Sequence, residues 1–195
     1  MTYAKETKTT FLNRLYGRLT PSEILQVRTA YMLAKHAHRA QRRKQTNANG
    51  DPMRYFEHVR RVALILMDRT ENWNANNVCV ALLHDTIEDT KDVDADVIEH
   101  IFGREVCQDV LTLTKDQWQN YQCKLRTGSV AALVVKMCDR LDNMQSLRAE
   151  EVGEEFRERQ KKETREMYIP LFEELLGHLK ELRPLLDELH ELAQI

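Results

Sequence analysis

Glycine is scarce in this chain, and no two glycines lie close together. The 195 residues include only six glycines, at positions 17, 50, 103, 128, 153 and 177. No pair of them can form the glycine-rich turns whose backbone amides hold phosphates in many nucleotide-binding proteins. Proline is also rare, with four residues, so few positions break a helix. We therefore expect a largely helical protein that would bind any phosphate through side chains.

The charge balance argues against nucleic acid as a partner. The chain carries 29 Lys and Arg against 31 Asp and Glu, whereas a dedicated nucleic-acid binder usually has a strong basic excess. No apolar run approaches the roughly 18 residues of a membrane span, and the first ten residues lack the apolar core of a signal peptide. The four cysteines form no C-x-x-C pair, which is typical of reduced thiols in the cytoplasm. We predict a cytoplasmic protein that binds neither nucleic acid nor membrane.

Capping signals and apolar periodicity predict a series of helices. Thr20, Pro21 and Glu23 have the pattern of a capping box, and this helix is expected to run into residues 42–44, followed by a loop over 45–52. Ser129 is expected to cap another helix. The remaining predicted helices cover residues 55–67, 76–88, 94–101 and 104–113, with an irregular stretch over 115–127 and two charged helices broken near Gly177. The fold class predicted is all-α, in one domain over residues 1–195.

The segment ALLHDTIEDT, residues 81–90, places four chemically active side chains after an apolar run. They are His84, Asp85, Glu88 and Asp89. On a continuous helix His84 and Glu88 would be neighbours one turn apart, as would Asp85 and Asp89. Three carboxylates this close repel one another unless a cation lies among them. The alternative is a helix end with solvated acids.

A second segment, VVKMCDRLDNMQSL over residues 134–147, carries Asp139 inside an apolar helix. A buried carboxylate needs a partner or a metal. Lys136 and Arg140 are candidate ionic partners, so a structural ion pair is one alternative. Asn143 follows one turn later, on the same face as Asp139.

His58, in the segment YFEH, supplies a further ligand type. Alone it would more often be an ordinary core or surface histidine. Together, His58, His84, Asp85 and Asp139 form a mixed nitrogen and oxygen set that suits Mn²⁺, Fe²⁺ or Zn²⁺. Such an ion would acidify a water or bind a phosphate oxygen. Glu88 and Asp89 could then act as base and proton shuttle.

The order H…HD…D resembles the signature of the HD-domain phosphohydrolases. The chain is more closely similar to the hydrolase domain of Rel/SpoT-type alarmone enzymes, especially the free-standing small alarmone hydrolases. The resemblance spans residues 30–150, leaving 151–195 as C-terminal helices with no room for a synthetase domain. It rests on AHRAQRRK, YFEH, ALLHDTIEDT, FGREV followed by LTK, and KMCDRLDNMQSL, with TREMYIPL further on. It implies a single HD-type helical bundle.

The resemblance also implies roles for individual residues. His58, His84, Asp85 and Asp139 would hold Mn²⁺, while Glu88 and Asp89 would activate the attacking water. Asn143 would lie near that water and the ribose of the substrate. Arg43 would pack on the purine, with Lys44 beside it. The flat face of a guanidinium group is well suited to stacking on a base. The reaction implied removes the 3′-diphosphate of (p)ppGpp, or of an adenosine analogue such as (p)ppApp, as pyrophosphate.

Other basic residues are candidates for binding substrate phosphates, among them Lys115 and Arg140. The sequence departs from the family pattern at three places. Val59 follows the first histidine where proline is usual, and Asp142 replaces a usual His or Tyr on the nucleotide side. The loop after Lys44 is longer than usual.

Two other functions and one assembly question stay open. The chain could be an HD-type nucleotidase acting on 5′-monophosphates. It could instead be a catalytically idle HD-like regulatory module, although such modules typically lose ligands that this chain retains. Finally, Leu175, Leu179, Leu182, Leu186 and Leu189 follow a heptad rhythm that is interrupted by Pro184. They form either a homodimer seam or a helix hairpin packed on its own domain.

Overall fold

The computed structural model describes residues 6–46, 49–71, 73–115 and 118–194. Within it, side-chain caps define where several helices begin. Helix α2, Pro21–Ala37, starts with the predicted capping box between Thr20 and Glu23. Asp94 caps α6, Ala95–Phe102, and Ser129 caps α9, Val130–Ser146. Each cap satisfies a backbone amide that the first helical turn leaves without a partner. These three predicted helix starts are confirmed.

The boundary between α6 and α7, Arg104–Leu113, depends on one glycine. Gly103 has φ +88°, a conformation that glycine adopts without the steric cost of a side chain. It ends α6 and begins α7 directly, at the boundary predicted between the helices over 94–101 and 104–113. At the amino end of the chain, the short α1, Lys8–Asn13, buries Phe11 in the core.

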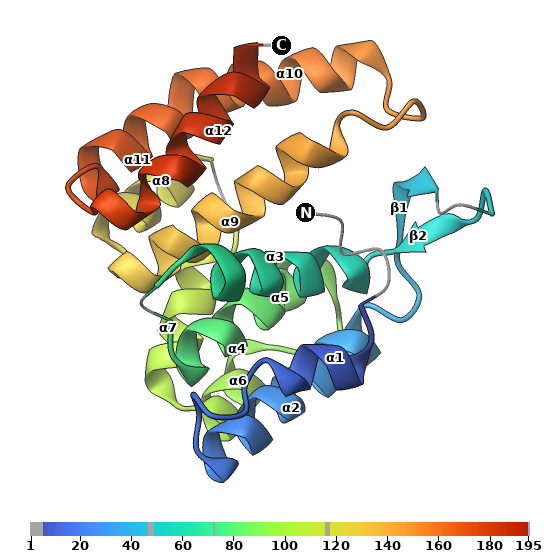
Figure 1. The fold of residues 1–195 in the computed structure, drawn as a ribbon, viewed down its shortest axis with the longest axis vertical. Helices are drawn as coiled ribbons and strands as arrows, with labels where there is room; N and C mark the ends of the chain where they lie inside the picture. Colours follow the sequence, from blue (N-terminus) through green and yellow to red (C-terminus); the bar gives the residue numbers. More distant parts are fainter. Residues whose placement is uncertain (1–5, 47–48, 72, 116–117, 195) are drawn as a thin grey trace.

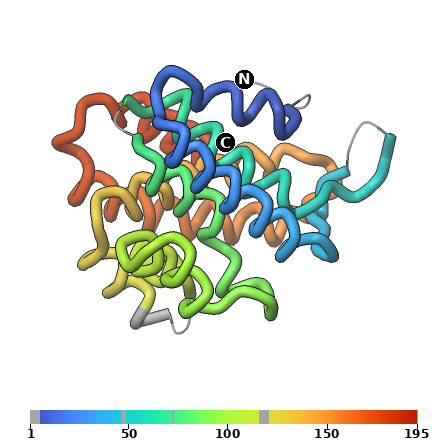
Figure 2. The backbone as a smooth tube through the Cα atoms, turned by 90° about the horizontal axis from the view of Figure 1, so that it is seen from below, coloured from blue at the N-terminus to red at the C-terminus, as the bar shows by residue number. Residues whose placement is uncertain are grey.

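The region after α2 differs from the prediction. The helix ends at Ala37 and the chain forms a two-stranded antiparallel sheet from β1, Arg42–Thr46, and β2, Pro52–Arg54. Figures 1 and 2 show this hairpin projecting from the helical body. The expected helix over residues 42–44 is wrong because β1 forms backbone pairs with β2. It also contacts the carboxyl end of α9, where the Gln45 amide donates to the Ser146 carbonyl at 3.3 Å.

Two further predictions of local structure are wrong. Residues 118–127, expected to be irregular, form α8, Trp118–Thr127. The expected continuous helix over 76–88 is divided into α4, Ala75–Leu83, and α5, Thr86–Asp89. The break falls at His84 and Asp85, so their side chains leave the backbone at the turn between two helices.

The core of the molecule forms around α3, Phe56–Arg69, α4 and α9, which pack against one another, while α2 covers α4. In Figure 1, α9 lies between this group and the C-terminal helices. The C-terminal helices are α10, Glu154–Glu163, a π-helical turn over Thr164–Tyr168, α11, Ile169–Leu176, a 3₁₀ turn over Lys180–Leu182, and α12, Arg183–Gln194. The all-α class is confirmed, with the hairpin as its one described β element.

The C-terminal leucines contribute to the core of the chain itself. Leu182, Leu186 and Leu189 are buried, and α12 packs on α9, α10 and α11. Leu175 and Leu179 are partly buried against the same core. This is the arrangement expected of a packed helix hairpin, and a homodimer stays a prediction. Within the described part of the chain, no helix combines the length and apolar character needed to cross a membrane.

Candidate metal centre

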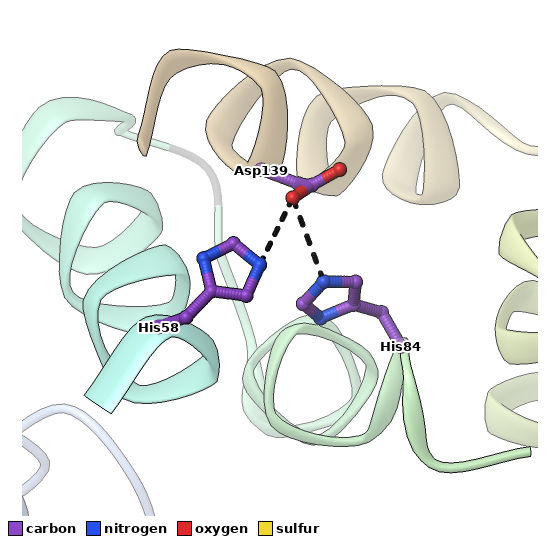
Figure 3. A group of neighbouring side chains, drawn as sticks. All are labelled: His58, His84 and Asp139. Atoms are coloured by element: carbon purple, nitrogen blue, oxygen red, sulfur yellow. Dashed lines mark ion pairs between the residues drawn. The ribbon is translucent and has the colours of Figure 1, made fainter. Parts of the chain in front are cut away.

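Three core helices bring His58, His84 and Asp139 together. His58 lies in the first turn of α3, His84 at the carboxyl end of α4, and Asp139 in the middle of α9. All three are buried, and one ligand atom from each falls within 4.8 Å of the others. The Oδ1 atom of Asp139 lies 3.1 Å from His58 Nε2 and 3.7 Å from His84 Nε2. Figure 3 shows both imidazole rings directed toward this carboxylate.

Asp85 adds a second carboxylate oxygen to the group. Its Oδ2 lies 3.0 Å from His84 Nε2 and 3.5 Å from His58 Nε2. The Tyr55 hydroxyl donates a hydrogen bond of 2.8 Å to the same oxygen. Two imidazole nitrogens and two carboxylate oxygens therefore converge, and these are the four side chains that the sequence brought forward as ligands.

His84 has the orientation of a ligand. Its Nδ1 lies 2.9 Å from the Ala81 carbonyl, to which it donates, so the lone pair of the neutral ring is on Nε2. That Nε2 atom is buried and makes no hydrogen bond of acceptable geometry, although the Asp85 carboxylate lies 3.0 Å from it. A buried polar atom without a partner is costly in a folded protein. A cation between Nε2 and the two carboxylates would satisfy it, so the residues present fit a divalent metal.

The electrostatics of the group favour positive charge. Burial alone would lower the pKa of the His84 imidazole, but the Asp85 and Asp139 carboxylates raise that pKa to about 10. Burial acts in the opposite direction on Asp139, whose pKa the Lys136 ammonium and the two imidazoles hold well below its usual range. Against desolvation, the His84 charge and the hydrogen bonds from both imidazoles likewise hold the pKa of Asp85 well below its usual range. Both carboxylates are therefore ionised, as metal ligands must be.

Asp139 is also held by two neighbours on α9. Lys136 donates to its Oδ2 at 2.8 Å, and the Asn143 amide donates to its Oδ1 at 2.6 Å. The Lys136 ammonium lies 5.5 Å from the ring centroids of both Tyr121 and Tyr168. The ion pair considered from the sequence thus exists, but it uses the oxygen that faces away from the histidines. The other oxygen stays directed into the group.

Glu88 and Asp89, the predicted base and proton shuttle, lie at the exposed side of the group on α5. Partial desolvation, followed by the charge of Asp85, raises the pKa of Glu88. Desolvation and Asp85 likewise raise the pKa of Asp89. The Lys115 backbone amide donates to Glu88 Oε2 at 2.7 Å, which places Lys115, a predicted phosphate contact, next to this carboxylate. A raised pKa suits a carboxylate that must accept a proton.

Arg43 reaches the group from the hairpin. Its guanidinium donates to the Asn143 side-chain oxygen at 2.9 Å and lies 5.8 Å from the centroid of the Tyr55 ring. Because Asn143 also donates to Asp139, the predicted purine-binding arginine is two hydrogen bonds away from a candidate ligand. The flat Arg43 guanidinium is therefore connected to the candidate metal centre through the Asn143 side chain.

Two predicted substrate-binding residues lie elsewhere. Arg140 is 3% exposed and bonds to Gln160 and Glu163, with its guanidinium 4.0 Å from the Tyr168 ring centroid. The prediction that it binds substrate phosphate is wrong because its charge is buried and paired on another face of α9. Lys44 is exposed and its ammonium lies 4.6 Å from the Phe156 ring centroid, since adjacent residues of β1 point to opposite sides.

The sequence analysis missed Tyr55 and misplaced Asp142. Tyr55 contacts Asp85, and Asp142 accepts a hydrogen bond from His58 Nδ1 at 2.7 Å. The expectation placed Asp142 on the nucleotide side; it is 2% exposed and lies directly behind His58, with Arg43 Nη1 3.8 Å from its Oδ2. The signal that could have found it is its position three residues after Asp139, on nearly the same helix face.

Three helices thus bring a buried pair of histidines together with carboxylates, in a group that could hold a divalent metal. Comparison with known protein families identifies the class of protein: an HD domain model matches residues 30–177. This chain belongs to the HD domain family.

Individual relatives narrow the comparison. The chain is 37% identical over 177 residues to the GTP pyrophosphokinase rsh of Brucella melitensis, covering 84% of this chain and 22% of that protein. It is 35% identical over 162 residues to the guanosine-3′,5′-bis(diphosphate) 3′-pyrophosphohydrolase of Aquifex aeolicus, covering 77% of this chain and 22% of that protein. The chain thus spans about a fifth of the length of these curated relatives.

A solved structure resembles this fold over most of both chains. It is described as a metazoan ortholog of SpoT that hydrolyzes ppGpp and plays a role in starvation responses. The TM-score is 0.69 with 27% identity, covering 85% of this chain and 94% of the other. The HD domain family and this likeness agree with the resemblance found in the sequence.

Proposed function

We propose that this chain is a metal-dependent hydrolase that removes the 3′-diphosphate of (p)ppGpp, or of an adenosine analogue such as (p)ppApp. The products are pyrophosphate and a nucleoside 5′-di- or triphosphate. The observation that carries the proposal is the buried group of His58, His84 and Asp139, with the partly buried Asp85 carboxylate 3.0 Å from His84 Nε2 and with Glu88 and Asp89 on the next helix. The names of the relatives support the choice of substrate.

The metal proposed is Mn²⁺, held by His58, His84, Asp85 and Asp139. A set of two imidazoles and two carboxylates without thiolates suits this ion. When bound, the ion supplies a more acidic water and a positive charge for a phosphate oxygen. The side chains contribute the orientation: the Ala81 carbonyl holds His84, Lys136 holds Asp139, and Tyr55 holds Asp85.

Glu88 is the base in this proposal. Its raised pKa and its position at the exposed side of the centre suit a carboxylate that accepts a proton from the attacking water. Asp89 has a raised pKa for the same reasons, and we assign it the transfer of that proton toward the departing 3′ oxygen. Water adds to phosphorus while the bond between phosphorus and the 3′ oxygen breaks.

Arg43 provides the surface for the purine. Its guanidinium is held by the Asn143 side chain, and a flat cation is a suitable platform for a base. We place Lys115, beside Glu88, close to the phosphates of the substrate. Asn143 connects the two parts because it donates to Asp139 while it accepts from Arg43.

The test is an assay that identifies products. Purified protein is loaded with Mn²⁺ and incubated separately with ppGpp, pppGpp, ppApp and a 5′-monophosphate, and phosphorus NMR identifies what is released. We expect pyrophosphate from at least one bis-phosphorylated nucleotide. Orthophosphate from the monophosphate alone would support the nucleotidase alternative. Metal-loaded protein that turns over none of them would contradict the proposal and favour a regulatory module. The cytoplasmic location stays a prediction from the sequence.

A further inference from the structure

The two histidines of the metal centre are oriented by different kinds of partner. His84 Nδ1 donates to a backbone carbonyl one turn earlier in its own helix. His58 Nδ1 instead lies 2.7 Å from Asp142 Oδ2, a side-chain carboxylate on another helix. Helix geometry fixes the orientation of His84, whereas the orientation of His58 depends on one residue of α9.

The hydrogen bond to Asp142 selects the tautomer of His58. An ionised carboxylate only accepts, so Nδ1 carries the hydrogen and the lone pair of the neutral ring is on Nε2. That Nε2 atom is the one directed toward Asp139 and Asp85. Carboxylate–histidine pairs of this kind orient metal ligands and increase their basicity.

Asp142 is itself held in its ionised form. Arg61, one turn after His58 on α3, donates from Nε to Asp142 Oδ1 at 2.6 Å and from Nη2 to Oδ2 at 3.0 Å. Although burial alone would raise it, the His58 hydrogen bond and the Arg61 charge hold the pKa of Asp142 well below its usual range. This two-point contact fixes the plane of the carboxylate, and so the direction from which His58 is held.

We propose that Asp142 is a positioning residue for the metal centre, which fixes His58 with Nε2 available as a ligand while the two-point contact from Arg61 holds the carboxylate in its orientation. This inference rests on the metal site proposed above. Asp142 does not itself reach the ligand group, because its oxygens are taken by His58 Nδ1 and by Arg61.

The experiment compares Mn²⁺ binding by calorimetry for the wild type and for D142N, which keeps the shape and removes the charge. We expect the dissociation constant to rise about 10–100-fold, the usual cost of losing an outer partner of a metal-binding histidine. The matched control is E163Q. It removes the carboxylate that lies 2.7 Å from Arg140, a residue on another face of α9. This control should bind Mn²⁺ as the wild type does, even if its unfolding temperature falls.

A second variant tests the same role in case D142N does not fold. R61M/D142L replaces the buried ion pair by apolar side chains, a change that folded proteins often tolerate, and it should lose Mn²⁺ affinity as D142N does. Wild-type affinity in either folded variant would overturn the role of Asp142. Failure of the wild type to bind Mn²⁺ would instead overturn the metal site, so the two failures are distinguishable.

Discussion

Asp139 and Arg140 are neighbours in the sequence, yet they belong to two different buried charge clusters on α9. Arg140 is matched by Glu163, Gln160 and the Tyr168 ring, all within the chain. On the side of Asp139, two carboxylates and two imidazoles converge, and His84 Nε2 makes no hydrogen bond of acceptable geometry. The polar groups of the first cluster are paired within the chain, whereas the second leaves a buried imidazole nitrogen beside two carboxylates, where a divalent cation would fit. Burial and charge alone do not distinguish a structural ion pair from a metal site; the difference lies in which atoms remain unsatisfied.

The largest effect is expected at Asp139. D139A removes a candidate ligand and leaves Lys136 without its carboxylate. Mn²⁺ affinity should fall by more than the roughly 10–100-fold that loss of an outer partner costs, and hydrolysis should be lost. Calorimetric titration of the folded variant checks this, and affinity within a few-fold of the wild type would remove Asp139 from the ligand set.

Glu88 should separate metal binding from turnover. E88Q keeps the shape of the side chain but removes the proposed base, so turnover should fall about 10²–10⁴-fold while Mn²⁺ binding is retained. Steady-state rates of pyrophosphate release and a parallel metal titration measure the two effects. Full turnover in E88Q would show that another group accepts the proton.

Substitution of Arg140 should lower the stability of the protein and leave its Mn²⁺ affinity unchanged, in contrast to substitution of Asp139. R140M leaves Glu163 without its partner and removes the stacking on Tyr168. We expect the free energy of unfolding to fall by about 3 kcal/mol, near the lower end for breaking a buried pair because Glu163 is partly exposed. Chemical denaturation measures this change. Mn²⁺ affinity should stay as in the wild type, and its loss would place Arg140 in the metal centre after all.

The pH dependence of hydrolysis tests the base more finely. The pKa of Glu88 is raised by desolvation and by Asp85, and a base works only when ionised. Activity should therefore be present above this raised pKa and fall about tenfold per pH unit below it. A pH profile of kcat/KM for the wild type should show this acidic limb. The same profile for E88Q should lack it, and an unchanged limb would assign the titration to a different group.

The smallest expected effect concerns the thiols. Burial raises the pKa of Cys138, directly before Asp139, to about 12, and it does the same for Cys79. Cys123 is exposed and should react rapidly with a thiol reagent, whereas Cys138 should react only when the protein opens. Saturating Mn²⁺ should slow the labelling of Cys138, because a ligand that binds only the folded state stabilises it. Peptide mapping after timed labelling follows each cysteine, and equal rates with and without metal would contradict this.

What could be predicted from the sequence is mainly local. Thr20, Asp94 and Ser129 cap helices through contacts within three residues, so their signals survive without knowledge of the fold. The four candidate ligands could be proposed because carboxylates and histidines stand out within apolar helices. Their convergence depends on how α3, α4 and α9 pack, which no local pattern contains.

The wrong predictions also arise where contacts distant in sequence decide the local structure. Strand β1 has no alternating apolar pattern, because its sequence RRKQT is polar throughout, and contacts with β2 and α9 stabilise it. Helix α8 was missed because only Tyr121 and Leu125 among its described side chains are buried. Arg140 was expected to bind phosphate because it is basic, but its guanidinium is paired with Glu163. One helical residue turns a side chain by about 100°, which is enough to place it in another cluster.

The most direct test of the metal centre is anomalous diffraction from crystals grown with Mn²⁺. We expect one strong peak per chain, about 2.0–2.3 Å from the Nε2 atoms of His58 and His84 and from carboxylate oxygens of Asp85 and Asp139. No peak should lie beside Arg140 and Glu163. Absence of a peak among the four predicted ligands at saturating Mn²⁺, or a peak at a different set of residues, would contradict the central claim.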